Sequence, residues 1–429
     1  MTKTPYAQRR ARLLEKMQHG IAIIPTAPEV ARNGDTHYGY RYDSSFYYLS
    51  GFTEPEAALV LIAGDTPQSM LFCREKNPER EIWDGHRFGP AAAQEQFGFD
   101  AAYPVAQLDE KLTELMCNQP ALFYPLGGDA AWDQRILKLR SAVQTKARSG
   151  IRAPNEIHDV RALLNEMRLF KDAHELDIMR RAAAISTQAH QRAMRFTRPG
   201  QFEYEVEAEL LHEFCRHGAR HAAYTPIVAG GANACVLHYV ENSAKLRDGD
   251  LLLVDAGCEV DGYAADITRS YPVNGRFSAA QKDVYEIVLA AQAAAIAAAQ
   301  PNNTWDAPHN AALRVLAQGF IDLKLCHGSV DAVLESESYK KFFMHRTGHW
   351  LGMDVHDVGD YKIGDNWRAL QPGMALTVEP GCYIRPADDV PPALWNIGIR
   401  IEDDVFITAQ GNEVLTGAAP KSVAQIEEL

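Results

Sequence analysis

The sequence predicts an α/β protein of two domains, the first a compact α/β unit and the second built from helix pairs and strands. The chain has 429 residues, which is enough for two or three domains. Strand and helix signals alternate along roughly the first 165 residues, and a helix pair followed by strands then occurs twice. With 46% hydrophobic and 23% charged residues, the composition is that of an ordinary globular protein.

The first domain, expected over residues 1–169, begins with an amphipathic helix from Tyr6 to Gln18. The start of the chain is basic and free of acids, as in transit peptides, but no apolar signal-peptide core follows, and we interpret it as part of this helix. Short apolar runs typical of buried strands then begin at Ile21, Ala58, Ser69 and Ala121. The run GIRAP at residues 150–154 breaks this pattern, and one or two helices follow it.

The second domain is expected over residues 170–429 and begins with a helix pair. Asp172 and Glu175 form a capping box that opens a long helix, and Ser278 and Gln281 form a second capping box at the start of a later helix. Further helices are expected over Tyr204–His217, from Ser278 onward and within Pro308–Leu325. Strands are expected to begin at Leu251, Gly262, Ala375 and Gly398. The order of elements favours a duplicated half-barrel, although no sequence repeat supports the duplication.

Composition excludes several classes of function. The 43 basic and 56 acidic residues give a net charge of −13, which repels phosphate backbones and anionic lipids, so we expect no nucleic-acid partner. The Ala-rich stretch at residues 289–299 is far shorter than the ~20 residues of a membrane-spanning helix. Seven cysteines, an odd number without a C-x-x-C pair, indicate reduced thiols and favour the cytoplasm.

Four carboxylates interrupt strands that otherwise look buried: Asp255, Asp266, Glu379 and Glu402, hereafter the four acids. Asp255 follows four apolar residues, where a carboxylate is costly unless it is paired, protonated or bound to a cation. A turn at Asp261–Gly262 would fold the next strand back and bring Asp266 beside Asp255. Any one of these acids, taken alone, is best interpreted as a structural residue that forms a salt bridge or caps a strand end. Together they repel one another, and two divalent ions would balance their charge.

Three histidines, His345, His349 and His356, fall within the segment HRTGHWLGMDVHD. Isolated histidines are mostly packing or surface residues, but a neutral imidazole is also the commonest transition-metal ligand. An oxygen-rich shell with one imidazole favours Mn²⁺, with Co²⁺, Zn²⁺ or Fe²⁺ as alternatives.

Other catalytic motifs do not fit the sequence. The segment His212–His217 resembles H-E-x-x-H but has one residue too many, so its histidines do not share a helix face, and we interpret it as an ordinary helix end. The sequence contains no G-x-S-x-G, Walker A or G-x-G-x-x-G motif.

The chain resembles the Xaa-Pro aminopeptidases (aminopeptidase P) of the creatinase and methionine-aminopeptidase superfamily over nearly its whole length. RYDSSFYYLSGFTEPEAALVLI at residues 41–62 and EIW at residues 81–83 are similar to the family's first domain. LLLVDAGCEVDGYAADITR, FFMHRTGHWLGMDVHD, LTVEPGCY and GIRIEDD resemble its metal-site motifs in the expected order. The resemblance implies a creatinase-like α/β domain followed by a pita-bread catalytic domain, a duplicated ααβ half-barrel.

The resemblance also implies roles for particular residues. Asp255, Asp266 and Glu402 would hold one metal ion, and Asp266 and Glu402 would bridge to a second ion held by His349 and Glu379. Residues matching the family's catalytic and substrate-contacting positions are His238, His345, His356, Tyr383 and Arg400. Trp83 matches a tryptophan that lies near a neighbouring subunit's site in oligomeric relatives, so a homodimer or homotetramer is expected.

The implied reaction releases the first residue of a peptide with proline at its second position. A hydroxide bridging the two metals would attack the peptide carbonyl, with Glu379 as general base and acid and His356 helping to stabilise the oxyanion. Arg400, two residues from Glu402 on one strand face, is expected to hold that carboxylate, or else to form a simple surface salt bridge.

Three alternatives remain open from the sequence. Prolidase, which cleaves Xaa-Pro dipeptides, has the same fold and metals. Methionine aminopeptidases generally lack such a first domain. A non-catalytic peptide-binding module of the same fold would have no reason to balance two metal charges with four acids.

Overall fold

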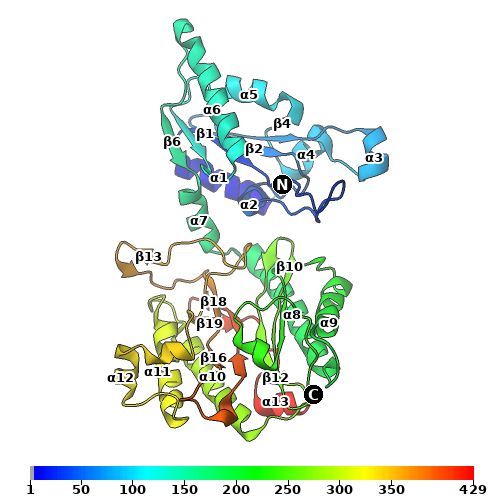
Figure 1. Ribbon diagram of the computed structural model, residues 1–429. Coiled ribbons are helices and arrows are strands. Elements are labelled where there is room, and N and C mark those ends of the chain that lie inside the picture. The colour runs from blue at the N-terminus through cyan, green and yellow to red at the C-terminus, as the bar shows by residue number, and fades with distance from the viewer. Residues whose placement is uncertain (1–3) are drawn as a thin grey trace. The chain divides into compact units, whose positions relative to one another are not determined.

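The computed structural model describes residues 4–429, and the chain divides into two compact units, Met1–Met167 and Arg168–Leu429 (Figure 1). This division lies two residues from the boundary predicted from the sequence, between residues 169 and 170.

The first unit is built on a six-stranded mixed sheet with strand order β4-β3-β2-β1-β5-β6. Its strands are β1 (Gly20–Pro25), β2 (Ala58–Ala63), β3 (Gln68–Cys73), β4 (Ala101–Pro104), β5 (Ala121–Tyr124) and β6 (Glu156–Asp159). Its helices are α1 (Pro5–Met17), α2 (Ser44–Ser50), α3 (Pro78–Asp84), α4 (Gly89–Phe97), α5 (Leu108–Leu115) and α6 (Ala130–Gln144), and α7 (Arg161–Leu169) follows across the division.

The apolar runs predict the inner strands of this sheet and miss its edges. β1, β2, β3 and β5 are the four expected strands, and β1 pairs with both β2 and β5 at the centre. The edge strands β4 and β6 are half-buried and exposed, so neither carries the apolar run by which a strand is found. The expected first helix is confirmed as α1, which Thr4 caps and Pro5 begins.

The second unit contains two helix pairs, each followed by a sheet. The helices are α8 (Ala173–Phe196), α9 (Glu203–Arg216), α10 (Ala279–Ala298), α11 (Ala307–Asp322), α12 (Val330–Glu335) and α13 (Val423–Glu427). α8 packs on α9, and α10 packs on α11. The predicted capping boxes of α8 and α10 are both present. The H-E-x-x-H-like segment forms the end of α9 as predicted, with His217 Nε2 2.9 Å from Glu213 Oε1.

The strands of this unit form several small sheets. In the first half they are β7 (His221–Ala222), β8 (Ile227–Gly230), β9 (Leu251–Asp255), β10 (Cys258–Val260), β11 (Tyr263–Ala264) and β12 (Thr268–Pro272). In the second half they are β13 (Lys362–Ile363), β14 (Asn366–Trp367), β15 (Ala375–Val378), β16 (Gly381–Ile384), β17 (Ile397–Arg400), β18 (Asp403–Thr408) and β19 (Gly411–Val414). The three-stranded sheets β12-β9-β8 and β15-β18-β19 follow the two helix pairs, which is the duplicated arrangement expected.

Three strands that the sequence predicts to be continuous are each broken at an acid. Asp266 lies between β11 and β12, Glu379 between β15 and β16, and Glu402 between β17 and β18. The breaks arise because the chain changes sheets there: β15 pairs with β18, whereas β16 pairs with β17. The predicted turn at Asp261–Gly262 is confirmed, since it joins β10 to β11 and both of its residues have positive φ.

Among the helices of residues 4–429, none has the length and apolar character needed to cross a bilayer.

Candidate active site

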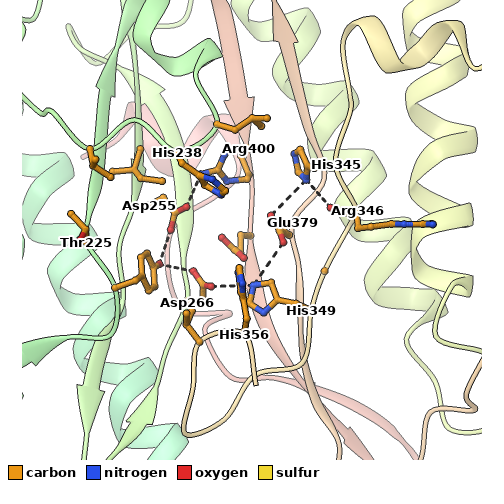
Figure 2. A pocket seen from close by; sticks show the side chains of 17 residues that line it. Thr225, His238, Asp255, Asp266, His345, Arg346, His349, His356, Glu379 and Arg400 are labelled. Carbon is orange, nitrogen blue, oxygen red and sulfur yellow. Dashed lines mark hydrogen bonds and ion pairs between the residues drawn. The ribbon is translucent and has the colours of Figure 1, made fainter. Parts of the chain in front are cut away.

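A cavity of about 440 Å³ in the second unit collects most of the residues that the sequence marks for chemistry (Figure 2). The four acids line it, together with His238, His345, His349, His356 and Arg400. The remaining lining residues are Tyr224, Thr225, Ile227, Leu237, Val240, Arg346, Gly348 and Val355. Segments more than a hundred residues apart thus contribute to one site.

The two aspartates reach the cavity from neighbouring strands. Asp255 is the last residue of β9, opposite Thr268 of β12. Asp266 just precedes β12, and its backbone N–H donates to Asp404 Oδ2 (3.1 Å). Asp255, Asp266 and Glu402 are all at most 8% exposed. Carboxylates so buried require compensation by donors or cations.

His349 faces the acids through one specific nitrogen. Its backbone N–H donates to Thr377 Oγ1 (3.1 Å), and its ring Nδ1 donates to the carbonyl of Trp350 (3.0 Å). This leaves Nε2 facing Asp266 Oδ2 at 3.4 Å and Glu379 Oε1 at 3.9 Å. A carbonyl that fixes the tautomer in this way is typical of metal-binding histidines.

His345 is fixed on both ring nitrogens. Nδ1 donates to the carbonyl of Arg346 (2.7 Å), and Nε2 accepts a hydrogen bond from the Tyr383 hydroxyl (2.8 Å). That hydroxyl in turn accepts from Arg400 Nη1 (3.1 Å). Tyr383 itself is fully buried and is not among the residues that line the cavity. In this structure its hydroxyl contacts His345 and Arg400.

Arg400 contacts a different acid from the one predicted. Its Nη2 donates to Asp255 Oδ2 (2.6 Å), and its Nε donates to Thr268 Oγ1 (3.1 Å). The Thr268 hydroxyl donates in turn to Glu402 Oε2 (2.6 Å). Strand β17 ends at Arg400, so Glu402 does not follow it on the same strand face as the sequence pattern assumes. Arg400 therefore reaches Glu402 through Thr268.

Tyr224 is the main site residue that the sequence analysis missed. Its hydroxyl lies 2.6 Å from Asp255 Oδ1 and 2.5 Å from Asp266 Oδ1, between the two aspartates. It precedes β8 in a segment, HAAYTP, without a recognisable motif. No signal in a single sequence distinguishes such a tyrosine from a packing residue.

Burial and mutual repulsion shift the protonation of the acids. Burial raises the pKa of Glu379 to about 7, against the opposing effect of His349. Burial and the neighbouring acids hold the pKa of Glu402 well above its ordinary value. Burial also acts on Asp266, but the hydrogen bond and charge of His349 outweigh it and lower the pKa of Asp266. The site thus holds negative charge at a cost that a cation would remove.

The donor set fits a metal ion. Asp266, His349 and Glu402 each offer one ligand atom, and these atoms lie within 4.8 Å of one another. Asp255 and Glu379 face the same cavity on either side (Figure 2). All five residues predicted as ligands therefore lie around one space.

The remaining predicted residues lie at different places. His238 and His356 line the cavity and are exposed, and the rings of His356 and His349 are in contact, with centroids 4.1 Å apart. Trp83 belongs to the first unit, on α3, where it is 83% exposed.

Comparison with known proteins places the chain in a family. Residues 177–409 match metallopeptidase family M24, and residues 6–124 match the aminopeptidase P N-terminal domain. The Xaa-Pro aminopeptidase of Escherichia coli is 44% identical over 432 residues, covering 100% of this chain and 98% of that protein.

Solved structures agree with this placement. The aminopeptidase PepP of Pseudomonas aeruginosa is 50% identical with a TM-score of 0.98, covering 100% of this chain and 98% of that one. The zinc-substituted aminopeptidase P of Escherichia coli in complex with product is 43% identical with a TM-score of 0.97, covering 100% and 98%. This chain belongs to metallopeptidase family M24 and carries the aminopeptidase P N-terminal domain. Its second unit is the pita-bread catalytic domain of that family.

Proposed function

We propose that this chain is an Xaa-Pro aminopeptidase, which releases the N-terminal residue of peptides with proline at the second position. The observation that carries the proposal is the convergence of four carboxylates and one imidazole in a peptide-sized cavity. Its close relatives of nearly equal length include the Xaa-Pro aminopeptidase of Escherichia coli, which supports the choice of substrate.

The proposed metal ligands rest on the donor set and on the family resemblance, which supplies their division between two ions. Asp255, Asp266 and Glu402 would hold one ion, while Asp266 and Glu402 would also bridge to a second ion held by His349 and Glu379. Two divalent ions would offset the negative charge of the four acids and counteract the burial and mutual repulsion that raise the pKa of Glu402. Carboxylate oxygens with one imidazole favour Mn²⁺, with Co²⁺, Zn²⁺ or Fe²⁺ as competitors.

The bound ions would lower the pKa of a coordinated water and polarise the scissile carbonyl. The protein's own groups would handle the protons. Glu379, with a pKa of about 7 before metal binds, is suited to accept the proton of the attacking water and to pass it to the leaving proline nitrogen. His356 would meet the negative charge developing on the carbonyl oxygen.

Positioning residues would hold these groups in place. Arg400 donates one hydrogen bond to Asp255 and another to the Tyr383 hydroxyl. Tyr383 in turn donates to His345 and so orients its ring. His238 and His345 would orient the residue after the scissile bond. Proline at that position has no N–H, so the site need not provide an acceptor for one. A free substrate amine would be attracted to the acids, which restricts cleavage to the N-terminus.

We also propose the setting in which the enzyme acts. Trp83 is 83% exposed on α3, and tryptophan is enriched at protein–protein interfaces relative to the rest of the surface. A homodimer or homotetramer would cover it. All seven cysteines are free thiols, which favours a reducing compartment such as the cytoplasm.

The proposal is tested by incubating the Mn²⁺-loaded protein with an Xaa-Pro-Yaa-Zaa tetrapeptide and with its N-acetylated form, and identifying the products by mass spectrometry. We expect free Xaa and Pro-Yaa-Zaa from the first peptide and no cleavage of the second. Cleavage of the acetylated peptide, or cleavage after proline, would contradict the proposal.

A further inference from the structure

Arg346 is an uncompensated charge on the wall of the catalytic cavity. The guanidinium of Arg346 makes no hydrogen bond or ion pair with any residue in 4–429, and its one close partner is the ring of Trp367, 5.5 Å from the guanidinium carbon to the ring centroid. Arg400, on the same cavity, is by contrast buried and bonded by three of its nitrogens. A cation left exposed beside a peptide-binding cavity is available to a ligand.

Arg346 points away from the acids. Figure 2 shows its side chain extending to the side of His345 and Glu379, opposite Asp255. The cavity therefore has negative charge at the metal ligands and positive charge at Arg346. A free peptide has the same polarity reversed, since its N-terminal ammonium is positive and its C-terminal carboxylate is negative.

A second, more open cavity of about 550 Å³ adjoins the first one, because Arg346 and Gly348 line both. Its other lining residues are three aromatic ones, Trp305, Tyr361 and Trp367, and two charged ones, Asp360 and Lys362. A peptide extended from the metal ligands past Arg346 would enter this cavity.

The aromatic wall is held rigidly. The ring centroid of Trp305 lies 4.1 Å from that of Trp350 and 4.6 Å from that of Tyr361, and its backbone N–H donates to the carbonyl of Arg368 (2.8 Å). Trp367 is paired with Lys362 across the β13–β14 hairpin. Rigid aromatic surfaces bind apolar side chains at low entropic cost.

The charged residues that line this second cavity are two positive, Arg346 and Lys362, and one negative, Asp360. Lys362 places its ammonium 4.5 Å from the Trp367 ring centroid. Asp306 lines a small cavity beside Arg346, but it lies outside ion-pair distance of the guanidinium and accepts from Asn310 Nδ2 (2.9 Å). The net preference at this end is for an anion.

We propose that Arg346 binds a carboxylate of the substrate on the carboxyl-terminal side of the proline, and that Trp367 and Trp305 pack against the side chain beside it. The carboxylate is the free C-terminus of a tripeptide or an acidic side chain of a longer peptide. This inference rests on the proposed function, because it assigns the part of the peptide that leaves with proline.

The experiment measures kcat/KM for Xaa-Pro-Leu against its C-terminal amide, and for Xaa-Pro-Glu-Ala amide against Xaa-Pro-Gln-Ala amide. We expect the intact protein to prefer the carboxylate of at least one pair by about fivefold, which corresponds to one exposed ion pair. Arg346→Gln should reduce that ratio to about one, and Arg346→Lys should keep part of it. The first pair reports the C-terminus, and the second reports an acidic side chain.

Arg314→Gln is the matched control, since Arg314 is an exposed arginine of the same unit that pairs with Asp331. It should leave both ratios unchanged. Calorimetric binding of the product Pro-Leu and of Pro-Leu amide provides a readout that does not need turnover, and Arg346→Gln should weaken only the acid. Ratios that are equal in the intact protein and Arg346→Gln would overturn the inference while the proposed function stands. Failure of every Xaa-Pro peptide to be cleaved would overturn both.

The aromatic wall is tested separately with Trp367→Ala. This variant should lose a preference for Xaa-Pro-Phe over Xaa-Pro-Ala, by about fivefold, and should keep the preference for the free carboxylate. Trp395→Ala, which removes a partly exposed tryptophan of the same unit outside both cavities, should keep both preferences. An unchanged Phe-to-Ala ratio in Trp367→Ala would contradict the packing role.

Discussion

The four acids stand in the folded protein with fewer cationic partners than their charge requires. Arg400 pairs with Asp255, and His349 faces Asp266, but burial still raises the pKa of Glu379 to about 7. Asp266 and Glu402 are the two acids proposed to bind both ions. Removing either one should therefore weaken the binding of both ions, because the remaining ligands would form an incomplete coordination shell.

Asp266→Ala and Glu402→Ala are each expected to remove bound metal and peptidase activity together. The measurement is metal content by mass spectrometry of the dialysed protein, alongside the rate of Xaa release. Asp331→Ala, which removes an exposed acid of the same unit, should change neither. If either site variant kept two ions per chain, the ligand assignment would be refuted.

The Tyr224 hydroxyl supports two acids at once, so we expect Tyr224→Phe to weaken metal binding by about 10- to 100-fold, the usual effect of losing a supporting hydrogen bond. A titration of the metal-free protein followed by calorimetry measures this. The circular dichroism of the variant should match that of the parent. An unchanged dissociation constant would show that Tyr224 only fills space.

At the scale of single residues, the sequence predicts the candidate metal ligands better than it predicts the residues that contact them. The acids are detectable because carboxylates rarely interrupt apolar strands, and His349 because three histidines cluster. Tyr224 carries no such signal. Which acid Arg400 contacts depends on where strand β17 ends, and strand periodicity does not reveal that end. Supporting residues are therefore found only when the fold brings distant segments together.

Among the elements, the pairing of β9 with β12 brings Asp255 and Asp266 together. Gly257, just after β9, lies so close to the returning chain that an added Cβ would stand 1.6 Å from the carbonyl oxygen of Ala265. That distance is far below any allowed contact, and the backbone would have to move.

Gly257→Ala should therefore separate the two aspartates, destabilise the fold by about 1 to 3 kcal/mol and lower metal affinity. Denaturant unfolding and metal titration together measure both effects. Gly34→Ala, at a glycine with open space around the added Cβ, is the control. A variant with unchanged stability and metal affinity would show that the backbone yields without cost.

Helix α8 contains a buried histidine that makes stability depend on pH. His190 is fully buried, and its Nε2 donates to the carbonyl of Ala256 (2.9 Å). Burial lowers the pKa of His190 from 6.5 to about 4. At pH values between 6.5 and about 4, His190 binds a proton in the unfolded chain but not in the folded chain. The free energy of unfolding therefore decreases as the pH falls through this range.

The free energy of unfolding should fall by up to about 1.4 kcal/mol per pH unit from this residue, and by about 3 kcal/mol in all between pH 6.5 and pH 4. Urea unfolding at several pH values measures it. His190→Asn should be less stable at pH 7 and flatter over this window, whereas His212→Asn, at an exposed histidine, should keep the slope of the parent. Parallel pH profiles for the parent and His190→Asn would contradict the account.

The positions of helices and strands were predictable from the sequence where a single local pattern marks the element. The capping boxes open α8 and α10, and apolar runs mark the inner strands of the first unit. The edge strands β4 and β6 and the division of long strands at the acids were not predictable, because pairing partners and sheet changes are decided by tertiary structure.

At the scale of the molecule, two units that match two different families occur in one chain. The duplicated order of helix pair and sheet was predictable from element order, but the number of small sheets in the second unit was not. We propose that the cavity of the second unit recognises the substrate, and the net charge of −13 disfavours a nucleic-acid partner.

The most direct test of the central claim is the initial rate of metal-stripped protein re-supplied with Mn²⁺, compared on an Xaa-Pro-Yaa tripeptide, an Xaa-Pro dipeptide and a Met-Ala-Yaa peptide. We expect Mn²⁺-dependent release of Xaa from the tripeptide and little cleavage of the other two. Dominant cleavage of the dipeptide would assign a prolidase activity instead. Bound metal with no cleavage of any of the three would contradict a catalytic role.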